Sequence, residues 1–217
     1  MTDSFQSLVP DTRRFLSELA ENNTRDWFLS QKPRYEAELK RPAEHLLAQV
    51  AADLEKLTGK PAKPKLFRAN RDVRFSKDKP PYHTHLHMLW TTENEARQPM
   101  GWFFGIGLDH LSVGAGLMGF EKATLTHWRA LIDGPLGSDL IAEAEMLRDQ
   151  GFRVTEPELK RVPPPYAKDH PRSEYLRRKG LSAWRDHQPG AMKAPVKIVM
   201  ADFAALLPLT QKLSQVI

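Results

Sequence analysis

The chain has 217 residues, of which 41% are hydrophobic and 27% are charged; these proportions are typical of a globular protein, and no apolar run reaches the roughly 20 residues of a membrane span. There is no cysteine, which excludes disulfides, thiolate metal sites and cysteine nucleophiles and, with an N-terminus unlike a secretory signal, indicates a soluble, cytoplasmic protein. The net charge of +5 makes nucleic acids, nucleotides and acidic metabolites the partners to consider.

The first third of the chain has the apolar spacing of helices. A first helix is expected to end where Asn23 or Thr24 can cap a second one. Pro33 suits the first turn of a further helix, with a break or kink near Pro42. This helical region is expected to end before Gly59.

The middle of the chain changes to strand signals. One strand is expected over residues 86–91, and a hairpin over 102–108 and 111–117 whose two-residue turn is Asp109-His110. Glycines recur at every second position on both strands of this hairpin, at 105, 107, 114 and 116. They leave smooth patches that a ligand or another backbone can approach, or they mark a bulge or bend.

After the hairpin, the helical spacing returns. Two helices are expected around residues 125–132 and 140–147, and a last one from Pro195. Short strands are expected at 152–155, 159–162 and 181–185. Because we find no repeat and no low-complexity linker, we expect a single α+β domain over residues 1–217. It would have a helical N-terminal third, a central antiparallel sheet with a glycine-rich hairpin, helices packed on the sheet and a C-terminal helix.

Positive charge concentrates in residues 67–82. Arginines recur there every three residues, two lysines follow, and hydroxyl groups are available from a serine and a tyrosine. The candidate ligand-binding residues are Arg68, Arg71, Arg74, Ser76, Lys77, Lys79 and Tyr82. Asp72 and Asp78 can pair with these cations in a rigid salt-bridged loop. Five cations against two carboxylates leave positive charge over, which favours a site for a phosphate-like anion.

A second basic cluster lies in residues 168–180. Arg177, Arg178 and Lys179 follow a short helix that Ser173 can cap, and cations there complement the helix dipole. Alternatively, Arg177 and Lys179 complete an anion site together with the first cluster.

His83, His85 and His87 would share one face of a strand. Three imidazoles can bind zinc, but neighbours on one strand rarely all reach one metal, and no acidic fourth ligand is obvious nearby. We therefore expect no metal and no cofactor, and we assign no catalytic residue. The aromatic side chains of Trp27 and Trp102 are expected in the core rather than as a surface on which bases stack.

Several of these segments together resemble a widespread bacterial family, the domain-of-unknown-function family 2461. The resemblance rests on Phe15-Leu16-x-x-Leu19, Asn22-Asn23-x-Arg25-x-Trp27-Phe28 and Tyr35, and on Arg71-Asp72-Val73-Arg74-Phe75-Ser76-Lys77-Asp78-Lys79-x-Pro81-Tyr82. The glycine-rich strands, Leu159-Lys160-Arg161-Val162-Pro163, Asp169-His170-Pro171 and Leu176-Arg177-x-Lys179 follow in the same order. The resemblance implies an α+β domain, no settled activity and no catalytic residue. It also suggests that the Arg71 to Tyr82 stretch of the first basic cluster and the Leu176 to Lys179 stretch of the second belong to one site. His83 and His87 depart from the pattern expected of relatives.

Three functions therefore compete. The first is binding of a phosphate-bearing small molecule or nucleotide, with Arg71, Arg74 and Lys77 converging with Arg177 or Lys179 around one cavity. The second is association with nucleic acid through the same basic clusters. The third is an interaction scaffold without a ligand. A deep pocket lined by the arginines favours the first function, and a broad convex basic face favours the second. Whether the protein is an enzyme, and its oligomeric state, are left open.

Overall fold

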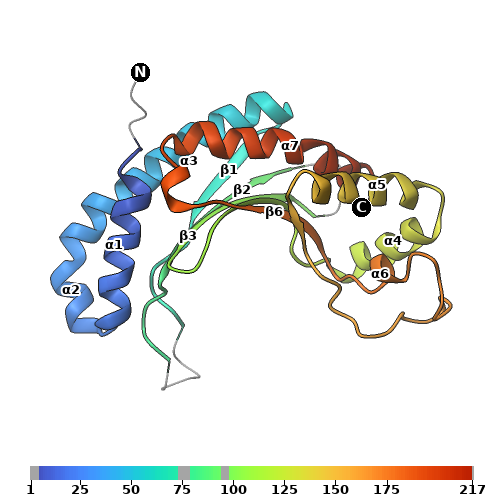
Figure 1. Ribbon diagram of the computed structural model, residues 1–217, viewed down its shortest axis with the longest axis horizontal. Coiled ribbons are helices and arrows are strands. Elements are labelled where there is room, and N and C mark those ends of the chain that lie inside the picture. The colour runs from blue at the N-terminus through green and yellow to red at the C-terminus, as the bar shows by residue number, and fades with distance from the viewer. Residues whose placement is uncertain (1–4, 73–78, 94–97, 217) are drawn as a thin grey trace.

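The computed structural model describes residues 5–72, 79–93 and 98–216, and it has an α+β fold (Figure 1). Its centre is a six-stranded sheet with antiparallel neighbours, as expected. The strands are β1 (Ala62–Leu66), β2 (His85–Thr92), β3 (Met100–Gly107), β4 (Leu111–Leu117), β5 (Arg153–Val154) and β6 (Leu181–Asp186). Their order across the sheet is β1-β2-β3-β4-β6-β5.

The N-terminal third is helical, as the apolar spacing predicts. It consists of α1 (Leu8–Glu21), α2 (Arg25–Arg34), the π-helix η1 (Tyr35–Lys40) and α3 (Arg41–Thr58). Thr24 caps α2 by accepting a hydrogen bond from the backbone N–H of Trp27 (3.3 Å). The expected helix start at Pro33 is wrong, because Pro33 lies inside α2. A proline removes one N–H donor, and the chain here continues through η1 into α3, where Pro42 occupies the first turn.

The C-terminal half adds helices around the sheet. They are α4 (Lys122–Asp133), α5 (Leu136–Asp149), α6 (Ser173–Leu176), the 3-10 turn η2 (Pro189–Ala191) and α7 (Pro195–Val216). The strand expected over residues 159–162 is absent. Leu159 donates its backbone N–H to the carbonyl of Arg177 (3.0 Å), but this contact is not part of a strand pairing. Among the described helices, none has the length and apolar character needed to cross a membrane.

The sheet has the shape of an arch in Figure 1, with α3 and α7 above its convex face. On β2, alternate side chains (Leu86, Met88 and Trp90) are buried under these helices, and the Trp90 indole donates to the carbonyl of Leu47 on α3 (2.9 Å). The helices α1 and α2 stand at one end of the arch, and α4 to α6 stand at the other. No described helix crosses the concave underside between them.

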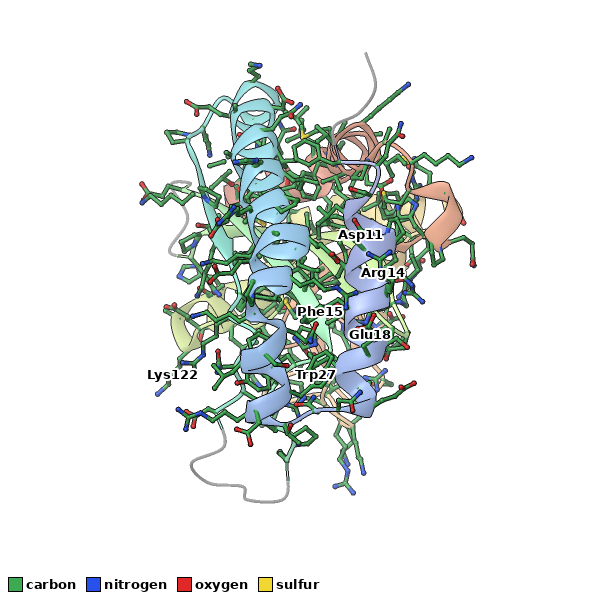
Figure 2. The ribbon with its side chains drawn as sticks, turned by 90° about the vertical axis from the view of Figure 1, so that its left-hand side faces the viewer. Asp11, Arg14, Phe15, Glu18, Trp27 and Lys122 are labelled. Carbon is green, nitrogen blue, oxygen red and sulfur yellow. The ribbon has the colours of Figure 1, made fainter. Side chains whose placement is uncertain are left out.

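A second, smaller core joins α1 to α2 and η1. Phe15 lies between the helices and contacts Trp27, as Figure 2 shows (ring centroids 5.6 Å apart). Outside this core, Arg34 bridges Glu18 on α1 (2.5 Å) and Glu38 on η1 (3.1 Å). These contacts fix the helical hairpin beside the arch.

Candidate functional site

A cavity of about 1120 Å³ lies on the concave face of the sheet. Its lining comes from the five neighbouring strands β2 to β6, from Arg13 of α1, from the connection between β3 and β4, and from segments that follow other strands of the sheet. Aromatic, histidine and acidic side chains line it, among them Phe67, His87, Phe103, His110, Trp184 and Asp186. A cavity of this size is in the range of small-molecule sites.

The strand register arranges the floor of the cavity in two cross-strand rows. The polar row is His87, Gly105, Ser112 and Asp186. The aromatic row is Phe103, Gly114 and Trp184. Paired residues of adjacent strands point to the same face of a sheet, so each row presents its side chains together.

Side chains of other residues cover three of the four hairpin glycines, whereas Gly116 lies against the backbone of β6 at Leu181 and Ser182. A Cβ atom at Gly105 would lie 3.1 Å from the His87 ring, and one at Gly114 would lie 2.5 Å from the Trp184 ring. The His110 ring similarly occupies the space beside Gly107. The glycines were expected either to leave smooth patches or to mark a bulge or bend. The smooth patch is the better description, but rings of the protein itself fill it.

The histidines form a continuous file along the rim. The ring centroids of His83 and His85 are 4.7 Å apart, and those of His85 and His87 are 3.7 Å apart in a stacked arrangement. His87 Nε2 then lies 3.1 Å from Nε2 of His110, whose Nδ1 is 2.7 Å from the carboxylate of Asp109. Asp109 and His110 were expected as a two-residue turn. In the structure, β3 ends at Gly107 and β4 begins at Leu111. Arg13 of α1 donates a hydrogen bond to the carbonyl of Leu108 in this connection (2.8 Å).

His85 and His87 are uncharged at neutral pH. Burial, and after it the neighbouring imidazoles, lowers the pKa of His85 and of His87 to about 4. Within the described ranges, no three histidine or acidic side chains are grouped as a metal site would require. Each neutral imidazole instead provides one N–H donor and one acceptor.

The opposite end of the polar row is Asp186, whose carboxylate accepts two hydrogen bonds. Ser112 Oγ donates to Asp186 (2.5 Å), and Arg153 Nε donates to the same carboxylate (3.2 Å). Burial acts to raise the pKa of Asp186, but the hydrogen bonds from Ser112 and Arg153 outweigh it and the pKa is lowered. Arg153 and Asp186 therefore balance each other, so that this end of the cavity is not strongly cationic.

The first basic cluster lies at the outer end of the histidine file. The backbone N–H of His83 donates to the carbonyl of Ala69 (2.8 Å) and that of Arg71 donates to the carbonyl of Pro81 (2.8 Å), so the two segments run side by side. Burial, and after it the charges of Arg71 and Arg68, lowers the pKa of His83. Arg71 is half-buried, and its Nε has no hydrogen-bond partner among the described residues. Arg68 and Lys79 are exposed. Arg74, Ser76 and Lys77 lie outside the described residues.

Tyr82 does not line the cavity. Its ring is buried in the smaller core and stacks on Phe28, with the ring centroids 3.9 Å apart. Asn23 holds the backbone of Tyr82 through hydrogen bonds to its carbonyl (3.0 Å) and from its N–H (3.1 Å). Tyr82 thus anchors the basic segment to the helical hairpin.

The second basic cluster is not near the first, so the expectation of one shared site is wrong for the described residues. Arg68 and Arg71 follow β1 at the end of the sheet where His85 pairs with Gly107. Arg177 and Lys179 precede β6 at the opposite end, where Leu181 pairs with Leu117. The six residues of β6 span roughly 20 Å, which exceeds the reach of a side chain. Spacing along the chain does not reveal at which end of an antiparallel sheet a loop emerges.

Arg177 and Lys179 have local roles at that far end. The half-buried Arg177 donates from Nε to the carbonyl of Ser173 (3.3 Å), and the N–H of the exposed Lys179 donates to Glu158 (2.6 Å). The residues that sequence reasoning missed are Phe103, Arg153, Trp184 and Asp186. Their only signal in the sequence was the alternation of side chains along each strand, which places them on the face of the sheet opposite to the buried core residues.

Comparison with known proteins gives one family. A family model described as "Conserved hypothetical protein (DUF2461)" matches residues 11–211. Neither the curated proteins nor the solved structures provided a match. The matched range includes every strand of the sheet and the whole floor of the cavity. The chain therefore belongs to the DUF2461 family, as its motifs predict.

Proposed function

We propose that this protein binds an organic anion on the concave face of its sheet. The anionic group lies near Arg71 and Arg68, and the rest of the molecule occupies the cavity. The observation that carries the proposal is the file of imidazoles, which runs from the cavity at His87 to His83, where the backbone segment that carries Arg68 and Arg71 is hydrogen-bonded alongside.

Arg71 is the strongest donor for the anionic group. A buried guanidinium nitrogen without an acceptor is unfavourable, and Nε of Arg71 is in this situation within the described part of the chain. A phosphate or carboxylate oxygen supplies the missing acceptor and also forms a charge-assisted hydrogen bond. Arg68 adds positive charge from an exposed position.

The histidine file suits the connecting part of such a ligand. Neutral imidazoles offer donors and acceptors without repelling either an anion or an uncharged polar group. Beyond the file, the Phe103 and Trp184 side chains offer apolar surface. A ligand with an anionic end, a polar middle and an apolar end matches this order of arginines, histidines and aromatic side chains.

Thermal unfolding with added anions tests the proposal. The panel is inorganic phosphate, ribose 5-phosphate and AMP, and AMP at ten times its dissociation constant should stabilise the protein by about 1.4 kcal/mol, or by about 3–6 °C. Arg71→Ala should remove most of this gain, and Arg71→Lys should restore little because it loses the planar fork of donors. Arg177→Ala is the matched control, since Arg177 lies at the far end of the sheet, and it should keep the full response. A gain that survives in Arg71→Ala, or no gain with any anion, argues against the proposal.

The second candidate function is binding of single-stranded nucleic acid. The observation in its favour is that Lys63 and Lys65 alternate with the core-facing residues of edge strand β1, which places them on the concave side. An oligonucleotide could then continue from the cavity along this edge. A filter-binding titration with fifteen-nucleotide oligo(dA) at about 50 and 200 mM salt distinguishes nucleic-acid binding from binding of a small organic anion. Tight binding that falls steeply with salt, combined with no response to free nucleotides, would favour the nucleic-acid function.

A further inference from the structure

We infer that Trp184 and Phe103 form a stacking surface for a planar ring, so that the ligand of the concave face is a heteroaromatic anion of the nucleotide class. This inference rests on the proposed function and specifies its substrate class. It is carried by the way in which glycines allow two aromatic rings to lie on the sheet.

Trp184 lies across the backbone of the neighbouring strand. Its register partner on β4 is Gly114, and a Cβ atom there would be 2.5 Å from Cε3 and 2.6 Å from Cδ2 of the indole. The ring therefore occupies the volume of the missing side chain. The indole N–H donates to Ser182 Oγ (2.9 Å), which fixes the ring in this position. Trp184 is only half-buried and lines the cavity.

Phe103 lies beside it from the other direction. It is the second register partner of Gly114, on β3, and its ring fills the space beside Gly101. The Phe103 and Trp184 ring centroids are 5.3 Å apart, with an angle of 31° between the planes. Two half-buried rings at this shallow angle present a broad π surface to the cavity rather than two edges.

The position of this surface suits a nucleobase. The polar row is two residues further along the same strands, or roughly 7 Å away. A ring stacked on Trp184 and Phe103 has His87, Ser112 and Asp186 beside its edge, where a heterocycle carries hydrogen-bonding groups and a hydrocarbon ring carries none. Stacking of a base on an aromatic side chain contributes a sequence-tolerant part of nucleotide affinity.

A purely structural role for the two rings makes a different prediction. Aromatic side chains that cover glycines stabilise a sheet without binding anything. In that case, replacing Trp184 would change stability and leave the preference among ligands unchanged. The test therefore compares ligands that share the anionic group and differ only in the base.

The experiment is isothermal titration of the full chain with AMP, GMP, CMP and UMP, each compared with ribose 5-phosphate. We expect the best nucleotide to bind at least ten-fold more tightly than ribose 5-phosphate. Trp184→Leu should reduce that ratio to within about three-fold and leave the affinity for ribose 5-phosphate unchanged, whereas Trp184→Phe should keep most of the ratio. Trp27→Leu, in the smaller core, is the control and should keep the ratio of the parent protein. Thermal unfolding verifies that each variant is folded.

The outcomes separate the two proposals. Equal affinities for nucleotides and ribose 5-phosphate, or a ratio unchanged in folded Trp184→Leu, overturn the stacking surface and leave the anion-binding function standing. If neither nucleotides nor ribose 5-phosphate bind, the proposed function itself fails, and the stacking surface fails with it.

Discussion

At the scale of single residues, the histidine file links stability to pH. His85 and His87 face His83, His110, Arg71 and Asp109, and their pKa values of about 4 lie below the ordinary value of 6.5. The unfolded chain therefore takes up protons at a higher pH than the folded chain does. Stability is greatest above pH 6.5 and falls as the pH decreases towards 4.

Because both side chains are partly exposed and solvent screens their charges, we predict a loss of roughly 2 kcal/mol across that interval, less than the full pKa shifts would give. His87→Gln, which cannot be protonated, should make the loss about half as large in urea unfolding curves recorded from pH 7 to pH 4. His127→Gln, a change at an exposed histidine of α4, is the control. Identical pH profiles for the parent protein and His87→Gln would contradict the assignment.

Arg178 and Arg177 are adjacent but differ in burial. The Arg178 side chain is fully buried, is 2.6 Å from Glu174 and stacks against the Tyr175 ring with 4.8 Å to its centroid. Arg178→Ala would leave a cavity and remove an ion pair with the partly exposed Glu174, so it should destabilise the protein by about 3 kcal/mol. Arg177→Ala should cost less than about 0.5 kcal/mol. Chemical denaturation of both variants measures this contrast, and similar values for the two would be inconsistent with it.

At the scale of elements, the close approach of β4 to β6 depends on Gly114. A Cβ atom there would meet the Trp184 ring at 2.5 Å and the carbonyl of Ala183 at 2.8 Å. Since a backbone carbonyl cannot move aside, Gly114→Ala should destabilise the protein by about 1–3 kcal/mol and shift the fluorescence of Trp184. Gly119→Ala, where no atom lies within 4 Å of the new Cβ, should be nearly neutral. A Gly114→Ala variant that is as stable as the parent protein would show that β4 and β6 are not this close at Gly114.

Local patterns in the sequence predicted most elements but not all. The helices and the hairpin follow from apolar spacing, and Thr24 acts as the predicted cap. Strand β1 was missed because Pro64 and two lysines obscure its signal, and an edge strand tolerates all three. The strand expected over 159–162 fails because propensity alone does not provide a pairing partner.

At the scale of the whole molecule, the candidate site is a product of the sheet order. The basic segment before β2 was recognised in the sequence, but its distance from Arg177 follows from which ends of β2 and β6 lie together. Trp184 and Phe103 are 81 positions apart in the chain numbering (184 minus 103), and only the register of three strands places them on either side of Gly114. No local spacing encodes that register, so the cavity could not be predicted from the sequence.

The most direct test of the central claim, that an aromatic anion binds on the concave face, is an NMR titration of the five tryptophan indole N–H signals with AMP. Trp184 lines the cavity, whereas Trp90, Trp102 and Trp128 are buried in the core. The signal that disappears in Trp184→Phe identifies Trp184. We predict that this signal shifts saturably with AMP while the three buried signals stay in place. The absence of a saturable shift at Trp184 with AMP and with the other three nucleotides would contradict the account.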